Sequence, residues 1–163
     1  MTTSSHVRDE GHPHGPVLLV STQGGHLAHL LALQLWWEGH DRIWVCPGTP
    51  DVVDRLAGER VVLSYSPTTR NLRNLARNTL LAARLLRRER PSLVVSAGAG
   101  VAVPFFVIAW LLGIPTVFIE VYDRVDTPTM TGRLCGPFTT RRIVQWQSQL
   151  AFYPDARLVG PLL

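Results

Sequence analysis

Two glycines and a histidine stand where an apolar run of the chain gives way to a helical pattern. Gly24, Gly25 and His26 follow the buried-strand pattern of residues 17–20 and precede an apolar helical run that starts at Leu27. Glycines let another molecule approach the main chain, and a helix N-terminus offers unpaired N–H groups that suit a phosphate. A histidine there titrates near neutral pH and can take a proton from a hydroxyl. The stretch fits a site for phosphate-linked substrates, and it fits equally a plain strand–helix turn with a surface histidine.

A second glycine turn follows a later strand pattern. Residues 97–100 read Ala-Gly-Ala-Gly and come directly after the apolar run 93–96. The carboxyl ends of parallel strands meet at one edge of a sheet, and open α/β sheets bind ligands along that edge. We therefore expect Gly98 and Gly100 to lie beside the first glycine turn.

A carboxylate ends the next strand pattern, residues 116–120. Glu120 would reach the same edge of the sheet as His26, and the loop beyond it carries Arg124. Either His26 or Glu120 could act as a general base in one cleft, and the sequence leaves this choice open. Thr127 is expected to cap a short helix that has Pro128 at its first position.

The spacing of the apolar runs predicts an α/β domain with a mostly parallel sheet. At 163 residues the chain is long enough for one domain with a sizeable core. We expect a disordered tail over residues 1–15 and a single domain over residues 16–163. The expected strands are 17–21, 42–46, 60–65, 93–96, 116–120, 142–145 and 157–159. The expected helices are 26–39, 51–56, 71–90, 102–112 and 148–152, with a brief one that ends near Gly136.

The predicted helix 71–90 lies in an arginine-rich part of the chain. Seven of the 16 arginines fall between residues 70 and 90, where Glu89 alone opposes them. Within that helix, Arg73, Arg77, Arg84 and Arg87 share one side. This side is either a solvated face or a surface for anionic phospholipid headgroups or an acidic partner. Nucleic acid is a disfavoured partner, because no aromatic residues stand between these arginines to stack on bases.

The stretch from residue 91 to residue 119 carries no charge, and its length alone would suit a transmembrane segment. Glycines and prolines divide it into strand, turn, helix and strand, so we expect no membrane span. The helix expected at 102–112 is apolar nearly all round. It is either buried or presents Phe105, Phe106 and Trp110 to a membrane surface.

The composition narrows the class of protein further. Charged residues make up only 17% of the chain, which suggests that part of the surface is given over to a partner or a bilayer. Cys46 and Cys135 fit neither a disulfide framework nor a metal site, and we expect reduced thiols in a cytosolic protein. We expect no metal and no cofactor. The N-terminus lacks the apolar core of a signal peptide.

Five motifs, matched together and in order, resemble a known family. They are Gly24-Gly25-His26, Ala97-Gly98-Ala99-Gly100, Ile119-Glu120, Arg124-Val125-x-Thr127-x-x-x-Thr131-Gly132 and Val144-Gln145-Trp146. Over about residues 16–163 the chain resembles the PssD and CpsF proteins of bacterial exopolysaccharide synthesis. It is also similar to the membrane-side subunit of the eukaryotic transferase that adds the second N-acetylglucosamine to the dolichol-linked oligosaccharide.

The resemblance implies a Rossmann-like parallel sheet that forms the N-terminal half of a GT-B glycosyltransferase, similar to the N-terminal domain of MurG, made as a separate chain. A donor-binding partner that resembles the C-terminal half would bind the UDP-sugar. This chain would hold a polyprenyl-diphosphate-linked acceptor, and the pair would transfer a hexosyl or N-acetylglucosaminyl group. Since the chain lacks the N-terminal transmembrane helix of the eukaryotic subunit, we expect peripheral attachment at the cytoplasmic face of an anionic cell membrane.

By motif, the resemblance places His26 on the first glycine loop, which faces the interdomain cleft, and Glu120 on the family's strand-end carboxylate. From their chemistry, the expected catalytic residues are His26 and Glu120. The expected substrate-binding residues are Gly24, Gly25, Gly98, Gly100, Arg124, Thr127 and Thr131.

Two other functions remain as alternatives. The chain could be a non-catalytic membrane adaptor that recruits a catalytic partner. A self-sufficient dinucleotide-binding enzyme is disfavoured, because the first turn lacks G-x-G-x-x-G and the second strand ends in Cys46-Pro47, where a ribose-binding acid is expected.

Overall fold

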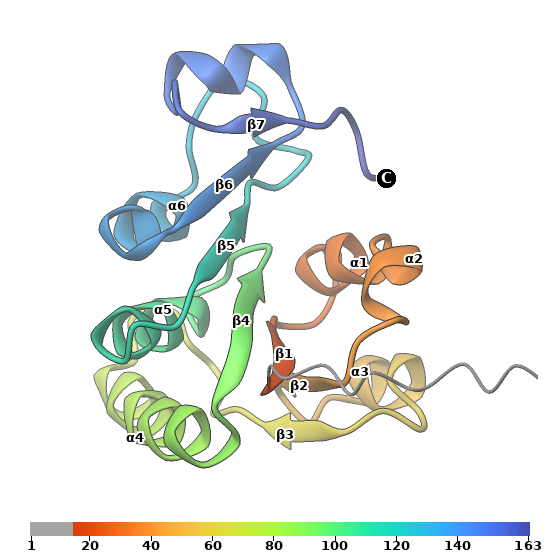
Figure 1. Ribbon diagram of the computed structural model, residues 1–163, viewed down its shortest axis with the longest axis vertical. Helices are drawn as coiled ribbons and strands as arrows, with labels where there is room; N and C mark the ends of the chain where they lie inside the picture. Colours follow the sequence, from red (N-terminus) through yellow and green to blue (C-terminus); the bar gives the residue numbers. More distant parts are fainter. Residues whose placement is uncertain (1–14) are drawn as a thin grey trace, which may run out of the picture.

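A computed structural model describes residues 15–163 as one seven-stranded sheet with helices on both faces (Figure 1). Neighbouring strands are all parallel, in the order β3-β2-β1-β4-β5-β6-β7. The strands are β1 (Gly15–Val20), β2 (Arg42–Cys46), β3 (Val61–Leu63), β4 (Pro91–Ser96), β5 (Thr116–Ile119), β6 (Arg141–Val144) and β7 (Arg157–Leu158). The helices are α1 (Gly25–Leu31), α2 (Gln34–Trp37), α3 (Pro50–Arg55), α4 (Leu72–Glu89), α5 (Ala102–Leu111) and α6 (Met130–Cys135), with 3₁₀ turns η1 (Gly136–Phe138) and η2 (Gln147–Ala151).

The predicted parallel α/β sheet is confirmed, and each expected strand is present with ends shifted by at most two residues. Gly15 already belongs to β1, and the rest of the predicted tail, residues 1–14, lies outside the described residues. The uncharged stretch 91–119 is divided into β4, α5 and β5, as its glycines and prolines predicted. Over residues 15–163 no helix combines the length and the apolar character that crossing a bilayer requires.

Helices cover both faces of the central strands, and successive residues of a strand point to opposite faces, so each central strand enters two clusters. Leu18 and Val20 of β1 pack into one cluster with side chains of α4 and α5. Val17 and Leu19 pack into a second cluster with side chains of α1, α2 and α3. Figure 1 shows α4, α5 and α6 on one side of the sheet and α1, α2 and α3 on the other.

Helix α5 is mostly buried, which corrects part of the expected membrane surface. Phe105 and Phe106 are both fully buried, and Phe106 packs edge-on against Phe118 of β5. These two rings fill the core between α5 and the sheet and cannot touch a bilayer. Trp110, near the end of the helix, is 57% exposed. Of the three aromatic residues considered for a membrane surface, Trp110 is the one whose side chain is exposed enough to reach it.

Helix α4 buries polar side chains in its first half. Leu72 and Leu75 are exposed, and Asn74 and Asn78 take the buried positions. The Asn78 amide donates to the backbone oxygen of Tyr65 and accepts from its N–H, each at 2.9 Å. This half of the helix packs on an irregular segment whose backbone groups have no sheet partner, so the buried side chains must be polar.

Two helix boundaries also differ from the prediction. The helix expected at 26–39 is broken at Leu33 into α1 and α2, and the Trp37 indole N–H folds back to donate to the carbonyl of Leu30 at 2.8 Å. The helix expected from Thr127 starts two residues later. Its cap is Thr129, whose hydroxyl accepts from the N–H of Gly132 at 2.9 Å.

Candidate functional site

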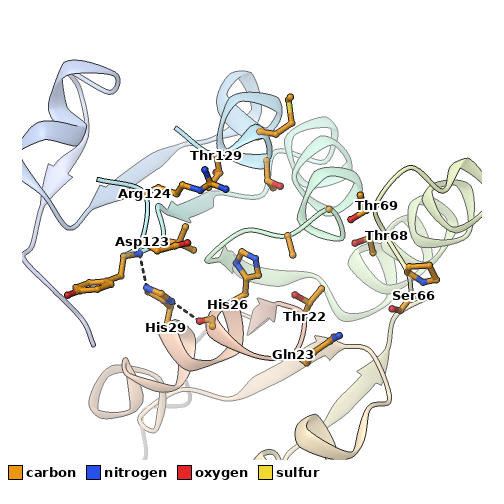
Figure 2. Close-up of a pocket in the computed structure, with 18 of the residues that line it drawn as sticks. Thr22, Gln23, His26, His29, Ser66, Thr68, Thr69, Asp123, Arg124 and Thr129 are labelled. Atoms are coloured by element: carbon orange, nitrogen blue, oxygen red, sulfur yellow. Dashed lines mark hydrogen bonds between the residues drawn. The ribbon is translucent and has the colours of Figure 1, made fainter. Parts of the chain in front are cut away.

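The strand order places a crevice at the carboxyl ends of β1 and β4. From β1 the chain moves outward through β2 to β3 and then returns to β4 on the other side of β1. At such a reversal the loops after the two central strands part, and open α/β sheets bind ligands there. A pocket of about 770 Å³ opens at this point (Figure 2).

Four stretches of chain line most of the pocket. They are the turn after β1, the segment after β3, the second glycine turn and the chain that follows β5. The lining residues are Thr22, Gln23, Gly25, His26, His29, Ser66, Pro67, Thr68, Thr69, Ala99, Gly100, Val121, Tyr122, Asp123, Arg124, Thr129, Met130, Thr131 and Leu163.

His26 is oriented by the second glycine turn. Its Nδ1 lies 3.0 Å from the carbonyl oxygen of Ala97. Since a carbonyl oxygen only accepts, Nδ1 carries the proton, and Nε2 of the neutral ring keeps a free lone pair. Figure 2 shows the ring among the lining residues of the pocket. In this tautomer of the neutral ring, Nε2 is the nitrogen that can accept a proton, as a general base must.

Gly98 lies close to the ring of this histidine. A Cβ atom built on Gly98 would lie 3.3 Å from both Cε1 and Nδ1 of His26, and the residue has a φ of 110°. Both observations favour glycine, because a side chain would crowd the ring and strain the backbone. Gly98 does not line the pocket itself, whereas Gly100 does.

In the first glycine turn, too, one glycine shapes the backbone and the other lines the pocket. Gly24 caps α1 with a φ of 74°, and its N–H donates to Asp51 Oδ2 of α3 at 3.3 Å. The space beside both glycines is open, since outside the adjoining chain no heavy atom lies within 4 Å of either Cβ position. Gly25, the first residue of the helix, lines the pocket, and Gly24 does not. Gly25 is therefore the glycine of this turn that a ligand can approach.

Glu120 lies at the same edge of the sheet as His26, as expected, but it does not line the pocket. The side chain is fully buried. Its Oε2 accepts from the Tyr153 hydroxyl at 2.7 Å and from the N–H of Thr129 at 3.4 Å, while Oε1 accepts from the N–H of Val121 at 3.2 Å. Burial, together with this carboxylate, raises the pKa of Tyr153, so the hydroxyl stays protonated and donates. The expectation of a carboxylate base facing the cleft is thus corrected to a buried carboxylate that holds the chain after β5.

Arg124 and Thr131 line the pocket, whereas Thr127 is exposed outside it. The loop that carries Arg124 is held by the chain after β6. Gln149 Nε2 donates to the carbonyl of Arg124 at 2.9 Å, and the Trp146 indole N–H donates to the carbonyl of Tyr122 at 2.7 Å. The motif Val144-Gln145-Trp146 therefore acts on the pocket through the backbone of this loop.

Sequence reasoning missed two contributors to the pocket. The first is the segment 66–69 after β3, which supplies hydroxyl groups at the side of Gly100. The second is His29, which is only 4% exposed. A polar residue three positions after His26, on the buried face of an apolar helix, was the signal for His29. No local pattern marks the segment 66–69, because only the sheet order brings it to β4.

The two thiols stand apart from this site. Cys46 and Cys135 are both buried and free. Burial raises the pKa of each thiol to about 12. Neither is a thiolate nucleophile at neutral pH.

A basic surface covers the outer side of α4. Arg73, Arg77, Arg84 and Arg87, which we call the arginine face, are all exposed. Leu72 (80% exposed) and Leu80 (50% exposed) stand beside and between them. Trp110 of the neighbouring helix α5 is exposed too, but its ring packs against Phe138, which follows α6. The face thus combines cationic and large apolar side chains.

The chain is similar in sequence to known proteins of oligosaccharide and cell-wall synthesis. A family model described as "Oligosaccharide biosynthesis protein Alg14 like" matches residues 61–162. The chain is 29% identical over 142 residues to the UDP-N-acetylglucosamine–N-acetylmuramyl-(pentapeptide) pyrophosphoryl-undecaprenol N-acetylglucosamine transferase of Geobacillus thermodenitrificans, an alignment that covers 76% of this chain and 38% of that protein. It is 34% identical over 85 residues to the human UDP-N-acetylglucosamine transferase subunit ALG14, and this alignment covers 48% of this chain and 39% of the human subunit.

Among solved structures, MurG of Acinetobacter baumannii superposes with a TM-score of 0.73 at 20% identity, over 88% of this chain and 45% of MurG. The fold is therefore that of the N-terminal half of a MurG-like GT-B glycosyltransferase. The aligned part makes up less than half the length of each of these three proteins. Since the family model matches more than half of this chain, the chain belongs to the Alg14-like family of oligosaccharide biosynthesis proteins.

Proposed function

We propose that this chain is the acceptor-binding subunit of a two-chain UDP-sugar glycosyltransferase of the PssD/CpsF type. The acceptor is a sugar linked to a polyprenyl diphosphate, and the product serves exopolysaccharide synthesis. A separate partner that resembles the C-terminal half of a GT-B enzyme binds the UDP-sugar. The observation that carries the proposal is the Ala97-bound His26 ring at the reversal point of a MurG-like sheet.

In this proposal His26 accepts the proton of the acceptor hydroxyl through Nε2. The Ala97 carbonyl keeps the ring in the required tautomer and stabilises the imidazolium that forms when the proton arrives. Arg124 at the pocket wall attracts the negative charge of a diphosphate. The open main chain at Gly25 lets phosphate oxygens approach backbone N–H groups.

The names of the relatives favour N-acetylglucosamine as the transferred sugar. The names of the Geobacillus enzyme and of the human subunit both contain UDP-N-acetylglucosamine and the word transferase. The Geobacillus name also specifies a pyrophosphoryl-undecaprenol acceptor, which is a lipid of the class proposed here.

The arginine face supports peripheral attachment at the cytoplasmic side of the membrane, where such an acceptor is embedded. Anionic headgroups attract exposed arginines, and Leu72 and Leu80 can enter the headgroup boundary beside them. The domain that the chain forms over residues 16–163 is then an acceptor-binding domain held at a bilayer surface.

Replacement of Arg73, Arg77, Arg84 and Arg87 by Gln should release the protein from vesicles that contain anionic phospholipid. Each arginine near such a surface contributes about 1 kcal/mol at low salt, and salt screens the effect. Cosedimentation at low and at physiological ionic strength measures the change. The control replaces Arg55, Arg133, Arg141 and Arg157, which are exposed on other elements, and removes the same net charge. Equal loss in the two variants would mean that net charge, and not the arginine face, drives the binding.

The function itself is tested by reconstitution. The purified chain, a donor-binding partner and their mixture are each given a labelled UDP-sugar and a polyprenyl-diphosphate-linked acceptor in vesicles. Labelled lipid product should form in the mixture, and little or none should form with either protein by itself.

A further inference from the structure

We propose that His29 is a positioning residue, which ties α1 to the loop after β5 and thereby fixes Arg124 across the pocket from His26. Its effect on acceptor binding rests on the proposed function. The tie itself is a property of the free chain and can be measured without a substrate.

Both ring nitrogens of His29 are used in hydrogen bonds (Figure 2). Nδ1 lies 2.7 Å from the carbonyl oxygen of Gly25, one turn earlier in α1. Nε2 lies 3.0 Å from the backbone nitrogen of Tyr122, 93 residues later in the chain. The side chain is 4% exposed, so water competes little for either contact.

The two partners define the protonation state of the ring. The Gly25 carbonyl can only accept, so Nδ1 carries a proton and donates. The backbone N–H of Tyr122 can only donate, so Nε2 is unprotonated and accepts. His29 is therefore a neutral imidazole that satisfies a helix carbonyl and a loop N–H at the same time.

The other tethers of this loop come from the opposite direction. Trp146 and Gln149 bind the carbonyls of Tyr122 and Arg124 from the chain after β6. Among the hydrogen bonds of residues 15–163, the contact between Tyr122 and His29 is the one that joins this loop to α1. Without it the loop would be held on one side only.

This tie bears on the pocket because of what lies at its two ends. Gly25, which accepts from His29, is followed directly by His26, and Tyr122 is followed by Asp123 and Arg124, all of which line the pocket. A bond between the ends sets the distance between the base and the arginine. His29 itself need not touch the reacting atoms.

The experiment compares His29→Leu with His29→Gln. Leucine removes both hydrogen bonds, whereas the glutamine side-chain oxygen can still accept from the Tyr122 N–H. In the purified chain, amide hydrogen exchange of the peptide that contains residues 121–128 should become about tenfold faster in His29→Leu. In His29→Gln it should stay within about twofold of wild type. His40→Leu, on the far side of α2, is the matched control and should leave this exchange unchanged.

In the reconstituted pair, His29→Leu should raise the KM for the lipid-linked acceptor about tenfold, with kcat and the KM for the UDP-sugar near wild type. His29→Gln should restore most of this loss. Unchanged exchange in His29→Leu would overturn the tie, and faster exchange with an unchanged acceptor KM would overturn the positioning role. An inactive wild-type pair would instead count against the proposed function, while the exchange result would still decide whether the tie exists.

Discussion

His26→Asn should lower the turnover of the assembled pair by about a hundredfold or more, because general base catalysis contributes an effect of that size. Asparagine can still donate an N–H to the Ala97 carbonyl, which His26 now does through Nδ1. It has no basic nitrogen in place of Nε2. The substitution therefore separates the orientation of the side chain from proton acceptance.

The fold should survive this change. His26 is only partly buried and makes its one side-chain hydrogen bond to Ala97, so the free energy of unfolding should change by less than about 1 kcal/mol. A thermal melt of the variant, beside the turnover assay, checks this expectation. His40→Asn, a histidine outside the pocket, is the control and should be active and stable. Wild-type turnover by the pair that carries His26→Asn would show that His26 is not the general base.

Glu120→Ala should destabilise the chain by about 3 kcal/mol, because it leaves several buried donors without an acceptor. The Tyr153 hydroxyl and the N–H groups of Thr129 and Val121 all lose their carboxylate partner. For a domain of this size the melting temperature should fall by roughly 10 °C. Asp126→Ala, an exposed carboxylate in the same part of the chain, should melt like wild type.

Glu120→Gln distinguishes a structural carboxylate from a catalytic one. The amide oxygen can still accept from the Tyr153 hydroxyl and the N–H of Thr129, and only the contact of Oε1 with the N–H of Val121 is lost. Turnover should therefore stay within about tenfold of wild type. A loss of a hundredfold or more in Glu120→Gln with an unchanged melt would move the base to Glu120. If His26→Asn and Glu120→Gln both stay active, the chain is better described as a membrane adaptor whose partner performs the chemistry.

The sheet and the position of its functional edge could be predicted, because both follow from local patterns. Apolar runs that end in glycines located the turns after β1 and β4, and parallel strands bring those turns together. The contact between His26 and Ala97 follows from that arrangement. The sequence could also suggest that Glu120 ends a strand at the same edge.

What could not be predicted depends on contacts between distant residues. The direction of the Glu120 side chain is decided by Tyr153, which lies 33 residues away. The break between α1 and α2 accompanies the bond from Trp37 to Leu30, and the buried face of α4 is decided by the backbone of the segment after β3. Periodicity reports that a helix has a buried side, but it does not report whether that side meets apolar side chains or backbone polar groups.

The central claim is that this chain supplies the acceptor half of a transferase whose donor half is another protein. The most direct measurement is the formation of labelled lipid product from a UDP-sugar by the chain alone, by the donor-binding partner alone and by the two together. The account predicts product from the mixture and little or none from either protein by itself, with the product lost when the chain carries His26→Asn. Robust turnover of the UDP-sugar by this chain without any partner would contradict it.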